Sequence, residues 1–392
     1  MPEVTNISEQ TFLGYSRATG PAGIRNRLLI LNTTGLSELT ARRIHSALPG
    51  SLFASTPYGG GMVGEDSLIH SNAISNMANH PNAGAVLVLG ADRPRCEQVS
   101  AVLGKSGKPH HTISYEDVGH DTLAMTDQGI RAGAKLSRDI SRQEPTHQPV
   151  ADLVIGLECG LSDPTSGLAA NPLLGSLSDM MVAAGGTVII GETLEWLGVE
   201  DRLASRAKSP KIAEDIRQAA LRRERVAQNA GINLSGINPN HANIQSGLTT
   251  IEEKASGSAA KSGNAEISGV LKYAEPPEGR GLYLMDAPSY SPESLTGFAA
   301  AGAQLMIFST GLGNSYVSSL APTIKVSANK FTADALQQQI DFDCSSLLAG
   351  TSREEETKRL FEFVAAIASG ALTFGEILGE GSETISRFGE SL

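Results

Sequence analysis

Short apolar runs alternate with longer segments of helical spacing along this chain. Runs of Leu, Ile and Val predict buried strands at residues 28–31, 85–90, 152–157, 187–191, 282–285, 305–308 and 322–326, with a weaker strand at 108–115. Apolar residues spaced three and four apart predict helices at residues 37–48, 123–140, 171–184, 211–229 and 292–301. Because strand–helix alternation is typical of parallel sheets joined by crossover helices, we predict an α/β fold of mainly parallel sheets flanked by helices.

A polar segment at residues 142–149, RQEPTHQP, interrupts this alternation and contains two prolines. The 392 residues also exceed the roughly 250–300 at which a single core stops growing. We therefore predict two units, an N-terminal α/β unit over residues 1–145 and a C-terminal α/β unit over residues 150–392. Residues 235–247 and 256–263 are rich in small and polar side chains and are predicted as loops.

Charge and cysteine content narrow the class of protein. A net charge of −11 argues against a nucleic-acid partner, whose binding surface would be basic. Three cysteines fit a reducing compartment better than a disulfide framework. No run reaches the roughly 18 apolar residues of a membrane span, and residues 1–6 do not resemble the start of a secretory signal. We therefore expect a cytoplasmic protein with no membrane partner.

Common cofactor motifs are missing from the sequence. The glycines at 59–61 could approach a ligand closely, but no helix-opening GxGxxG follows a strand with an acidic residue about 20 positions on. There is also no P-loop and no GxSxG nucleophile elbow. We expect none of NAD, PLP or ATP.

The segment ECGLSDPTSG, residues 158–167, follows one predicted strand directly. Carboxyl ends of strands form the ligand crevice of open α/β sheets. Glu158 and Asp163 offer carboxylates for acid–base chemistry or for a hard cation, and Ser162 and Ser166 can help to hold an anion. The alternative is that Ser162 or Asp163 only caps a helix.

The segment TTIEEK, residues 249–254, places Glu252 and Glu253 beside Lys254. Such neighbours shift each other's pKa and can form an acid–base pair. Thr250 with Glu253 three residues later also makes a capping box, and both interpretations can hold together. We predict that this segment and residues 158–167 converge on one crevice.

Isolated residues add further candidates. Glu192 follows a predicted strand, and His241 lies in the Asn-rich loop. Lys325 lies in a predicted strand and either neutralises a substrate carboxylate or points to solvent. Arg25 and Asn26 precede the first long strand, where surface solvation is the alternative.

Ordered motifs run from about residue 12 nearly to the C-terminus. They are GYSR at 14–17, GIRN at 23–26, ECG at 158–160, SD at 162–163, SG at 166–167, ANP at 170–172, GLTTIEEK at 247–254, GVL at 269–271, YAE at 273–275, MD at 285–286 and IKV at 324–326. This set resembles the large domain of the altronate and galactarate dehydratase family, which includes the large subunit of sulfolactate sulfo-lyase.

The resemblance implies a lyase. The family eliminates water, or sulfite in the sulfo-lyase, from a 2-hydroxy or 2,3-dihydroxy acid such as a sugar acid, through an enol that becomes a keto acid. It implies a hydroxy-acid substrate, a divalent metal such as Mg²⁺, Mn²⁺ or Fe²⁺, a separate small subunit and a homo-oligomer. Forming the enol requires a base for the proton and a cation for the developing charge.

This chain departs from the family pattern at residues 56–61, TPYGGG, where an HxxGCG-like stretch is expected. A cysteine is also expected near Leu36 and an arginine near Leu312. Since His and Cys are common metal ligands, we expect a weakly bound hard divalent ion or no metal. Two alternatives remain open: an isomerase or epimerase that stops at the enolate, and a non-catalytic binding subunit.

The candidate residues fall into three groups. The catalytic candidates are Glu158, Asp163, Glu252, Glu253 and Lys254. The substrate-binding candidates are Arg25, Asn26, Ser162, Ser166, Asn171, Thr249 and Lys325. The candidate metal ligands are Cys159, Glu192, His241, Glu275 and Asp286.

Overall fold

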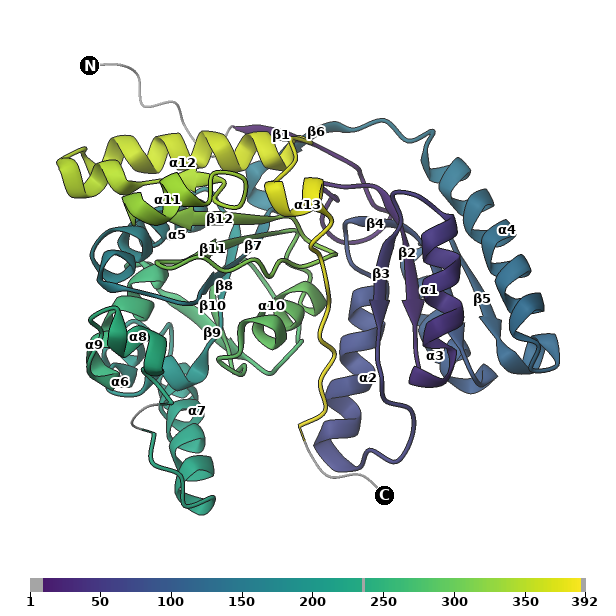
Figure 1. Ribbon diagram of the computed structural model, residues 1–392, viewed down its shortest axis with the longest axis horizontal. Helices are drawn as coiled ribbons and strands as arrows, with labels where there is room; N and C mark the ends of the chain where they lie inside the picture. Colours follow the sequence, from purple (N-terminus) through teal and green to yellow (C-terminus); the bar gives the residue numbers. More distant parts are fainter. Residues whose placement is uncertain (1–9, 235–236, 389–392) are drawn as a thin grey trace.

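The computed structural model describes residues 10–234 and 237–388 and contains two parallel sheets (Figure 1). The first is four-stranded, in the order β3-β2-β4-β5. Its strands are β2 (Arg27–Asn32), β3 (Leu52–Ser55), β4 (Ala83–Gly90) and β5 (His110–Ser114). Its helices are α1 (Glu38–Ala47), α2 (Gly64–Ala78), α3 (Arg93–Ser106) and α4 (Thr122–Ile140).

The second parallel sheet is seven-stranded, in the order β13-β12-β11-β7-β8-β10-β9. Its strands are β7 (Val154–Cys159), β8 (Thr187–Ile190), β9 (Ile267–Leu271), β10 (Gly281–Met285), β11 (Leu305–Ser309), β12 (Thr323–Ser327) and β13 (Phe342–Asp343). The longer helices are α5 (Asn171–Ala183), α7 (Pro210–Asn229), α9 (Ile251–Ala259), α10 (Ser291–Ala300) and α12 (Arg353–Ala368). Short helices are α6 (Glu200–Ala204), α8 (His241–Gln245), α11 (Lys330–Ala335) and α13 (Phe374–Leu378). The predicted α/β class with parallel sheets flanked by helices is confirmed.

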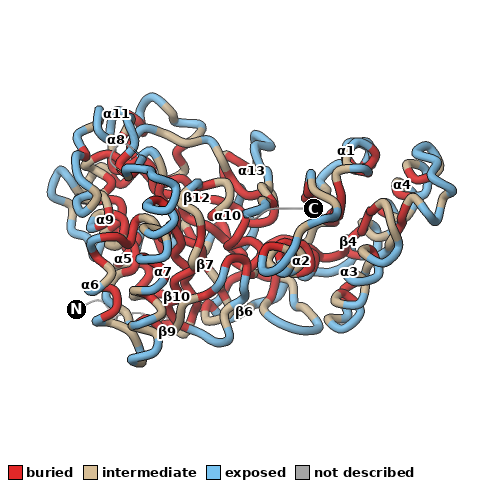
Figure 2. The backbone as a smooth tube through the Cα atoms, turned by 90° about the horizontal axis from the view of Figure 1, so that it is seen from below, coloured by how far each residue is buried: buried red, intermediate tan, exposed pale blue. Residues whose placement is uncertain are grey.

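The two sheets share one apolar core. Strand β4 is buried along its whole length, as expected for a parallel strand covered on both faces. Leu31 and Val88 of the four-stranded sheet belong to the same buried cluster as Ile189 and Phe308 of the seven-stranded sheet, with Phe298 of α10 among them. Figure 2 shows the buried backbone of α10 and the region around α2 between the two sheets. The sheets are therefore packed through a common layer of helices.

Segments predicted as boundary and loops contain regular structure. The end of the predicted boundary forms β6 (Thr146–Pro149), which pairs antiparallel with β1 (Thr11–Gly14). The prediction of a loop over 256–263 is wrong, because α9 continues to Ala259 and a 3-10 turn covers Ala260–Ser262. The small, polar side chains of this segment suggested a loop, but Ala255 and Ala259 favour a helix. Within 235–247, residues 235–236 lie outside the described residues and α8 occupies the later part.

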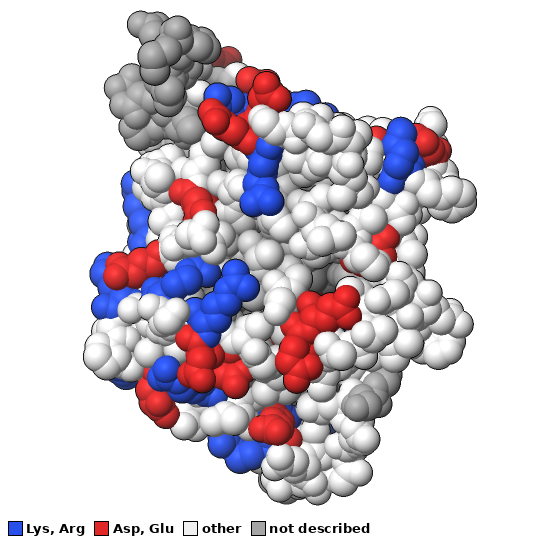
Figure 3. All heavy atoms as spheres, turned by 90° about the vertical axis from the view of Figure 1, so that its left-hand side faces the viewer, with Lys and Arg blue, Asp and Glu red and all other residues white. Residues whose placement is uncertain are grey.

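The surface and helices give two further constraints on partners. Acidic and basic side chains are interspersed on the face drawn in Figure 3, with broad uncharged areas between them. No extended basic surface of the kind that holds nucleic acid is visible there. Among the described helices, none is both long and apolar enough to cross a membrane.

Candidate active site

Two neighbouring strands of the seven-stranded sheet lead into acidic residues. Glu158 and Cys159 end β7, and successive strand residues point to opposite faces. Glu158 accordingly faces α10, where Ser294 Oγ donates to its Oε2 at 2.7 Å. Glu192 follows β8 with a φ of 65°, a left-handed conformation that is uncommon outside glycine. Such strain gathers at functional sites, where the surrounding contacts hold it.

A buried cluster of charged side chains lies on the Cys159 side of the sheet. Lys261 Nζ donates to Cys159 Sγ at 2.9 Å and to the Glu192 carboxylate. Lys254 Nζ pairs with Glu195 Oε1 at 2.6 Å. Cys159 Sγ lies 3.5 Å from Glu192 Oε2 and 3.6 Å from Glu195 Oε2, so it joins the two pairs. The Lys261 and Glu192 side chains are 0 % and 1 % exposed, and burial of that kind requires pairing.

Helix α9 carries Lys254, and the 3-10 turn that follows it carries Lys261. Thr250 is the N-cap of α9, and the Thr250 side chain accepts from Glu253 N. Lys254, Ser258 and Lys261 follow at spacings of four and three, which places them on one helical face. The helix packs closely on the turn after β7, because a Cβ on Gly257 would lie only 3.2 Å from Gly167 Cα.

The cluster borders a cavity of about 310 Å³ at the carboxyl edge of the sheet. The loop after β7 lines it with Cys159, Ser162, Asp163, Pro164 and Gly167, and α9 with its preceding turn lines it with Leu248, Glu253, Lys254 and Ser258. The predicted convergence of residues 158–167 and 249–254 on one crevice is therefore confirmed. Glu195 also lines this cavity, whereas Lys261 and Glu192 lie behind its wall.

Electrostatics distinguish the members of the cluster. Burial opposes the ionisation of Glu195, but the ammonium groups of Lys254 and Lys261 outweigh it and lower the Glu195 pKa. Burial likewise opposes the charge of Lys254, and the neighbouring Glu195 reverses this effect and raises the Lys254 pKa. The cavity wall therefore holds a carboxylate beside an ammonium ion.

Burial raises the pKa of three other groups at this edge. Burial raises the pKa of the Cys159 thiol, helped by the negative charge of Glu192. Burial and the charge of Glu195 raise the pKa of Glu192 against the pull of Lys261. Burial and the charge of Glu192 raise the pKa of Glu158 well above its usual range, and Glu158 Oε1 has no hydrogen-bond partner among the described residues.

Cys159, Glu192 and Glu195 offer ligand atoms that lie within 4.8 Å of one another. A thiolate and two carboxylates are compatible with a divalent ion by ligand type. Lys254 and Lys261 also contact the two carboxylates, so an ion at this place would share these oxygens with two ammonium groups. The three side chains are therefore compatible with a divalent ion by ligand type and distance.

Several predicted residues surround the cavity in supporting positions. Asp163 accepts from Ser166 N at 3.0 Å and from Asn329 Nδ2 at 2.8 Å. Thr250 Oγ1 accepts from Glu253 N at 3.0 Å, which confirms Thr250 as the helix cap. The Glu253 carboxylate accepts from Thr249 N at 2.9 Å and so does not close a capping box on Thr250. Ser162 Oγ is buried in the cavity wall without a hydrogen-bond partner among the described residues.

Asn171 and Glu252 differ in their relation to the cavity. Asn171 lines it and holds α9 in place, since Asn171 Nδ2 donates to Gly257 O at 2.9 Å. Glu252 is exposed and does not line it.

The predicted substrate-binding residues Arg25, Asn26 and Lys325 occupy other places. Arg25 pairs with Glu376 at 2.8 Å, and Asn26 donates to Ile140 O at 2.9 Å. Lys325 is buried with its Nζ 3.6 Å from the centre of the Phe308 ring, and it donates to Tyr316 O. One of the two predictions for Lys325, that it points to solvent, is therefore wrong. None of the three lines the cavity beside Cys159.

Three of the predicted metal ligands also lie apart from the Cys159 cluster. His241 and Glu275 are exposed, and Glu275 accepts from Lys272 N in a turn at 2.9 Å. Asp286 pairs with Arg222 and Arg223. Of the five candidate ligands, the structure groups only Cys159 and Glu192 within the described residues.

The sequence interpretation missed Glu195, Ser258 and Lys261. Glu195 lies three residues after the predicted Glu192, on the same short 3-10 turn. Lys261 was concealed by the loop prediction for 256–263. The helical spacing of Lys254, Ser258 and Lys261 was the available signal, and it becomes visible once α9 is recognised as continuous.

Two protein-family models match this chain, one over each parallel sheet. A family model described as D-galactarate/altronate dehydratase, C-terminal, matches residues 150–391. Another, described as D-galactarate dehydratase/altronate hydrolase, second domain, matches residues 14–141. The two matches together cover both parallel sheets.

Individual relatives agree with these matches. The beta subunit of (2R)-sulfolactate sulfo-lyase from Chromohalobacter salexigens is 34% identical over 390 residues, which cover 98% of this chain and 99% of that subunit. Altronate dehydratase from Escherichia coli is 32% identical over 387 residues, which cover 92% of this chain and 74% of that enzyme. Altronate dehydratase from Bacillus subtilis is 31% identical over 386 residues, which cover 93% of this chain and 75% of that enzyme. The chain belongs to the D-galactarate/altronate dehydratase family, as the motifs predict.

Proposed function

We propose that this chain is a lyase that removes sulfite from a small 2-hydroxy acid with a sulfonate on the neighbouring carbon, such as (2R)-sulfolactate. The observation that carries the proposal is the Lys254–Glu195 pair in the wall of the cavity, supported from behind by Lys261 and Glu192. An ionised carboxylate beside an ammonium ion meets the two needs of the reaction, a base for the proton and a cation for the developing charge.

The bond changes balance without any further reactant. A base removes the proton from C2, and the C–H electron pair forms the C2–C3 double bond. The C3–S bond breaks, and sulfite leaves with its electron pair. The enol product then takes a proton at C3 and becomes pyruvate. The protein needs to stabilise the negative charge that builds up on the substrate carboxylate during proton removal.

The geometry assigns roles to three residues. Glu195 remains ionised and lines the cavity, so it is the candidate base. Lys254 lies 2.6 Å from it and stabilises the carboxylate of the substrate as the enediolate forms. The unpartnered Ser162 hydroxyl is the candidate hydrogen-bond donor to the substrate. Lys261 and Glu192 act as positioning residues, because they hold Cys159 and the back of this wall.

The charge balance favours sulfite over hydroxide as the leaving group. Hydroxide leaves only with help from an acid or a metal ion, whereas sulfite leaves more readily. The two carboxylates of the cluster are already matched by Lys254 and Lys261, so a metal ion that assists hydroxide would compete with both lysines for them. The sulfo-lyase beta subunit also matches this chain over 99% of its own length.

Dehydration of a sugar acid is the second candidate, favoured by the 32% and 31% identity to altronate dehydratases. The test is a panel of (2R)-sulfolactate, altronate and galactarate, with and without divalent metal. Sulfite and pyruvate in equal amounts support the proposal. Deuterium uptake at C2 without product indicates an isomerase or epimerase instead. Absence of both indicates a non-catalytic binding subunit.

The proposal extends to partners and location. A separate small subunit is supported by the relative named as subunit beta, whose length this chain matches, whereas about a quarter of each altronate dehydratase lies outside the matched region. We also propose a homo-oligomer in the cytoplasm and the two units over residues 1–145 and 150–392. Light scattering of the purified protein tests the homo-oligomer. Separate expression of residues 1–145 and 150–392 tests the division into two units.

A further inference from the structure

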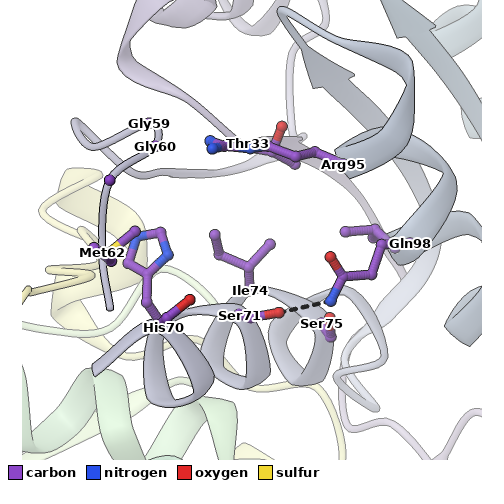
Figure 4. A pocket seen from close by; sticks show the side chains of 13 residues that line it. Thr33, Gly59, Gly60, Met62, His70, Ser71, Ile74, Ser75, Arg95 and Gln98 are labelled. Atoms are coloured by element: carbon purple, nitrogen blue, oxygen red, sulfur yellow. Dashed lines mark hydrogen bonds between the residues drawn. The ribbon is translucent and has the colours of Figure 1, made fainter. Parts of the chain in front are cut away.

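A second cavity lies at the carboxyl edge of the four-stranded sheet and measures about 200 Å³ (Figure 4). It is enclosed by Thr33 after β2, the loop of glycines at 59–61, His70 of α2, and Arg95 and Gln98 of α3. The chain runs from β2 to β3 on one side and then to β4 on the other, so this edge is a topological switch point. Open α/β sheets bind ligands at such points.

Among the described residues that line this cavity, Arg95 supplies the only charge and none is a carboxylate. Its Nε lies 3.7 Å from Asp92 Oδ2, and its two Nη atoms have no hydrogen bond to the described residues. Figure 4 shows the guanidinium reaching toward the glycine loop, opposite α2. A Cβ on Gly60 would lie in van der Waals contact with Arg95 Nη2 at 3.4 Å, so residue 60 lies directly beside the guanidinium.

The other walls offer hydroxyl, imidazole and amide groups. Thr56 Oγ1 accepts from Tyr58 N at 3.2 Å and lies 2.7 Å from His70 Nε2. His70 is buried, and burial lowers its pKa. The amides of the glycines at 59–61 make no hydrogen bond to the described residues.

We propose that this cavity binds a small oxyanion, a carboxylate or a phosphate, with the Arg95 guanidinium as its main partner. The planar guanidinium matches the two oxygens of such a group. Surrounding amides, hydroxyls and the His70 ring donate to the remaining oxygens. The volume limits the ligand to a few heavy atoms, since cavities for drug-sized ligands start near 300 Å³. This site is independent of the elimination proposed for the seven-stranded sheet.

Calorimetric titration of the full chain with inorganic phosphate and with pyruvate tests the site. Arg95→Gln removes the guanidinium, and Gly60→Val fills the cavity without changing the charge. Arg93→Gln is the matched control, because Arg93 lies on the same helix, pairs with exposed Asp117 and does not line the cavity. Lys254→Gln reports ligand that enters the other cavity instead.

The expected result is a dissociation constant weakened at least tenfold in Arg95→Gln and in Gly60→Val, because charge-assisted hydrogen bonds to the anion are lost. Arg93→Gln should stay within about twofold of the wild type, since its charge is exposed and screened. Binding of phosphate at Arg95 should also persist in Lys254→Gln, because Lys254 lines the other cavity. Binding of phosphate alone identifies a phosphate site, and binding of pyruvate alone identifies a carboxylate site. If Arg95→Gln fails to fold, Gly60→Val decides. No binding of either ligand up to about 10 mM, or undiminished binding in Gly60→Val, overturns the proposal.

Discussion

The two parallel sheets end in cavities of different chemistry. In the part of the chain that the structure describes, the cavity of the four-stranded sheet is lined by one charged side chain, Arg95, and by no carboxylate. The cavity of the seven-stranded sheet is backed by two lysines and two glutamates around a buried thiol. A single cation can hold an anion, but proton transfer needs a base beside a cation. The same architecture therefore supports binding at one edge and chemistry at the other.

The largest effect is expected where the buried cluster loses a charge. Lys261→Met leaves the Glu192 carboxylate buried without its cation, which should lower the free energy of unfolding by about 3–5 kcal/mol. Urea unfolding monitored by circular dichroism measures this. Lys211→Met is the control, because the Lys211 side chain is 82 % exposed and pairs with Asp215 at the surface. This variant should change the free energy of unfolding by less than about 1 kcal/mol. Equal losses of unfolding free energy in the two variants would mean that Lys261 does not stabilise the buried cluster.

A second expected effect concerns turnover. Glu195→Gln keeps an acceptor for Lys254 but removes the base, so kcat should fall at least about 100-fold, or roughly 2.7 kcal/mol in barrier. Pyruvate formation measured under saturating substrate gives the comparison. Glu214→Gln, an exposed position on α7, should retain full turnover. Wild-type kcat in Glu195→Gln would assign the base elsewhere.

The contact between the two sheets should respond to acid. His80 Nε2 donates to Ala303 O, its Nδ1 accepts from Asn82 N, and burial lowers the His80 pKa to about 3. Because this folded-state pKa lies below the unfolded value of about 6.5, the stability is present above pH 6.5 and is lost as the pH falls toward 3. Between pH 7 and pH 5 the His80 contribution should fall by about 2 kcal/mol. Urea unfolding at pH 7 and pH 5 should show a smaller drop in unfolding free energy for His80→Gln than for the wild type. An identical drop in both proteins would contradict the role assigned to His80.

The smallest effect should come from the cap of the lysine-bearing helix. Thr250→Ala removes the acceptor for Glu253 N and should lower stability by about 1 kcal/mol. Thr126→Ala, within α4, serves as control, since its hydroxyl only bonds back to Thr122 O. Thermal unfolding resolves the difference. Identical melting temperatures for the Thr250→Ala variant and the wild type would mean that α9 is held by its packing alone.

Much of the fold could be predicted from the sequence because its strands are continuous apolar runs. Strand β4 and helix α4 follow such patterns, and the structure places them close to the predicted ranges. Helix α3 has no strong apolar face, so its position depends on tertiary packing that periodicity does not report. Strand β6 is polar because it pairs at the surface with β1.

The site was harder to predict than the fold. Glu158, Cys159 and Lys254 belong to motifs, and strand ends made them candidates. Lys261 has no motif of its own, and its role depends on a helix that brings it back over Cys159. The family resemblance implied a metal, whereas the pairing of lysines with carboxylates depends on distances that no sequence shows.

The central claim is that the cavity beside Lys254 and Glu195 carries out the elimination. The most direct measurement follows sulfite and pyruvate from (2R)-sulfolactate with the wild type and Glu195→Gln, each purified together with any small subunit that accompanies it. The account predicts equal amounts of sulfite and pyruvate from the wild type and at least a 100-fold slower release from the variant, consistent with loss of a general base. Product release at the wild-type rate from Glu195→Gln, or pyruvate without sulfite, would contradict it.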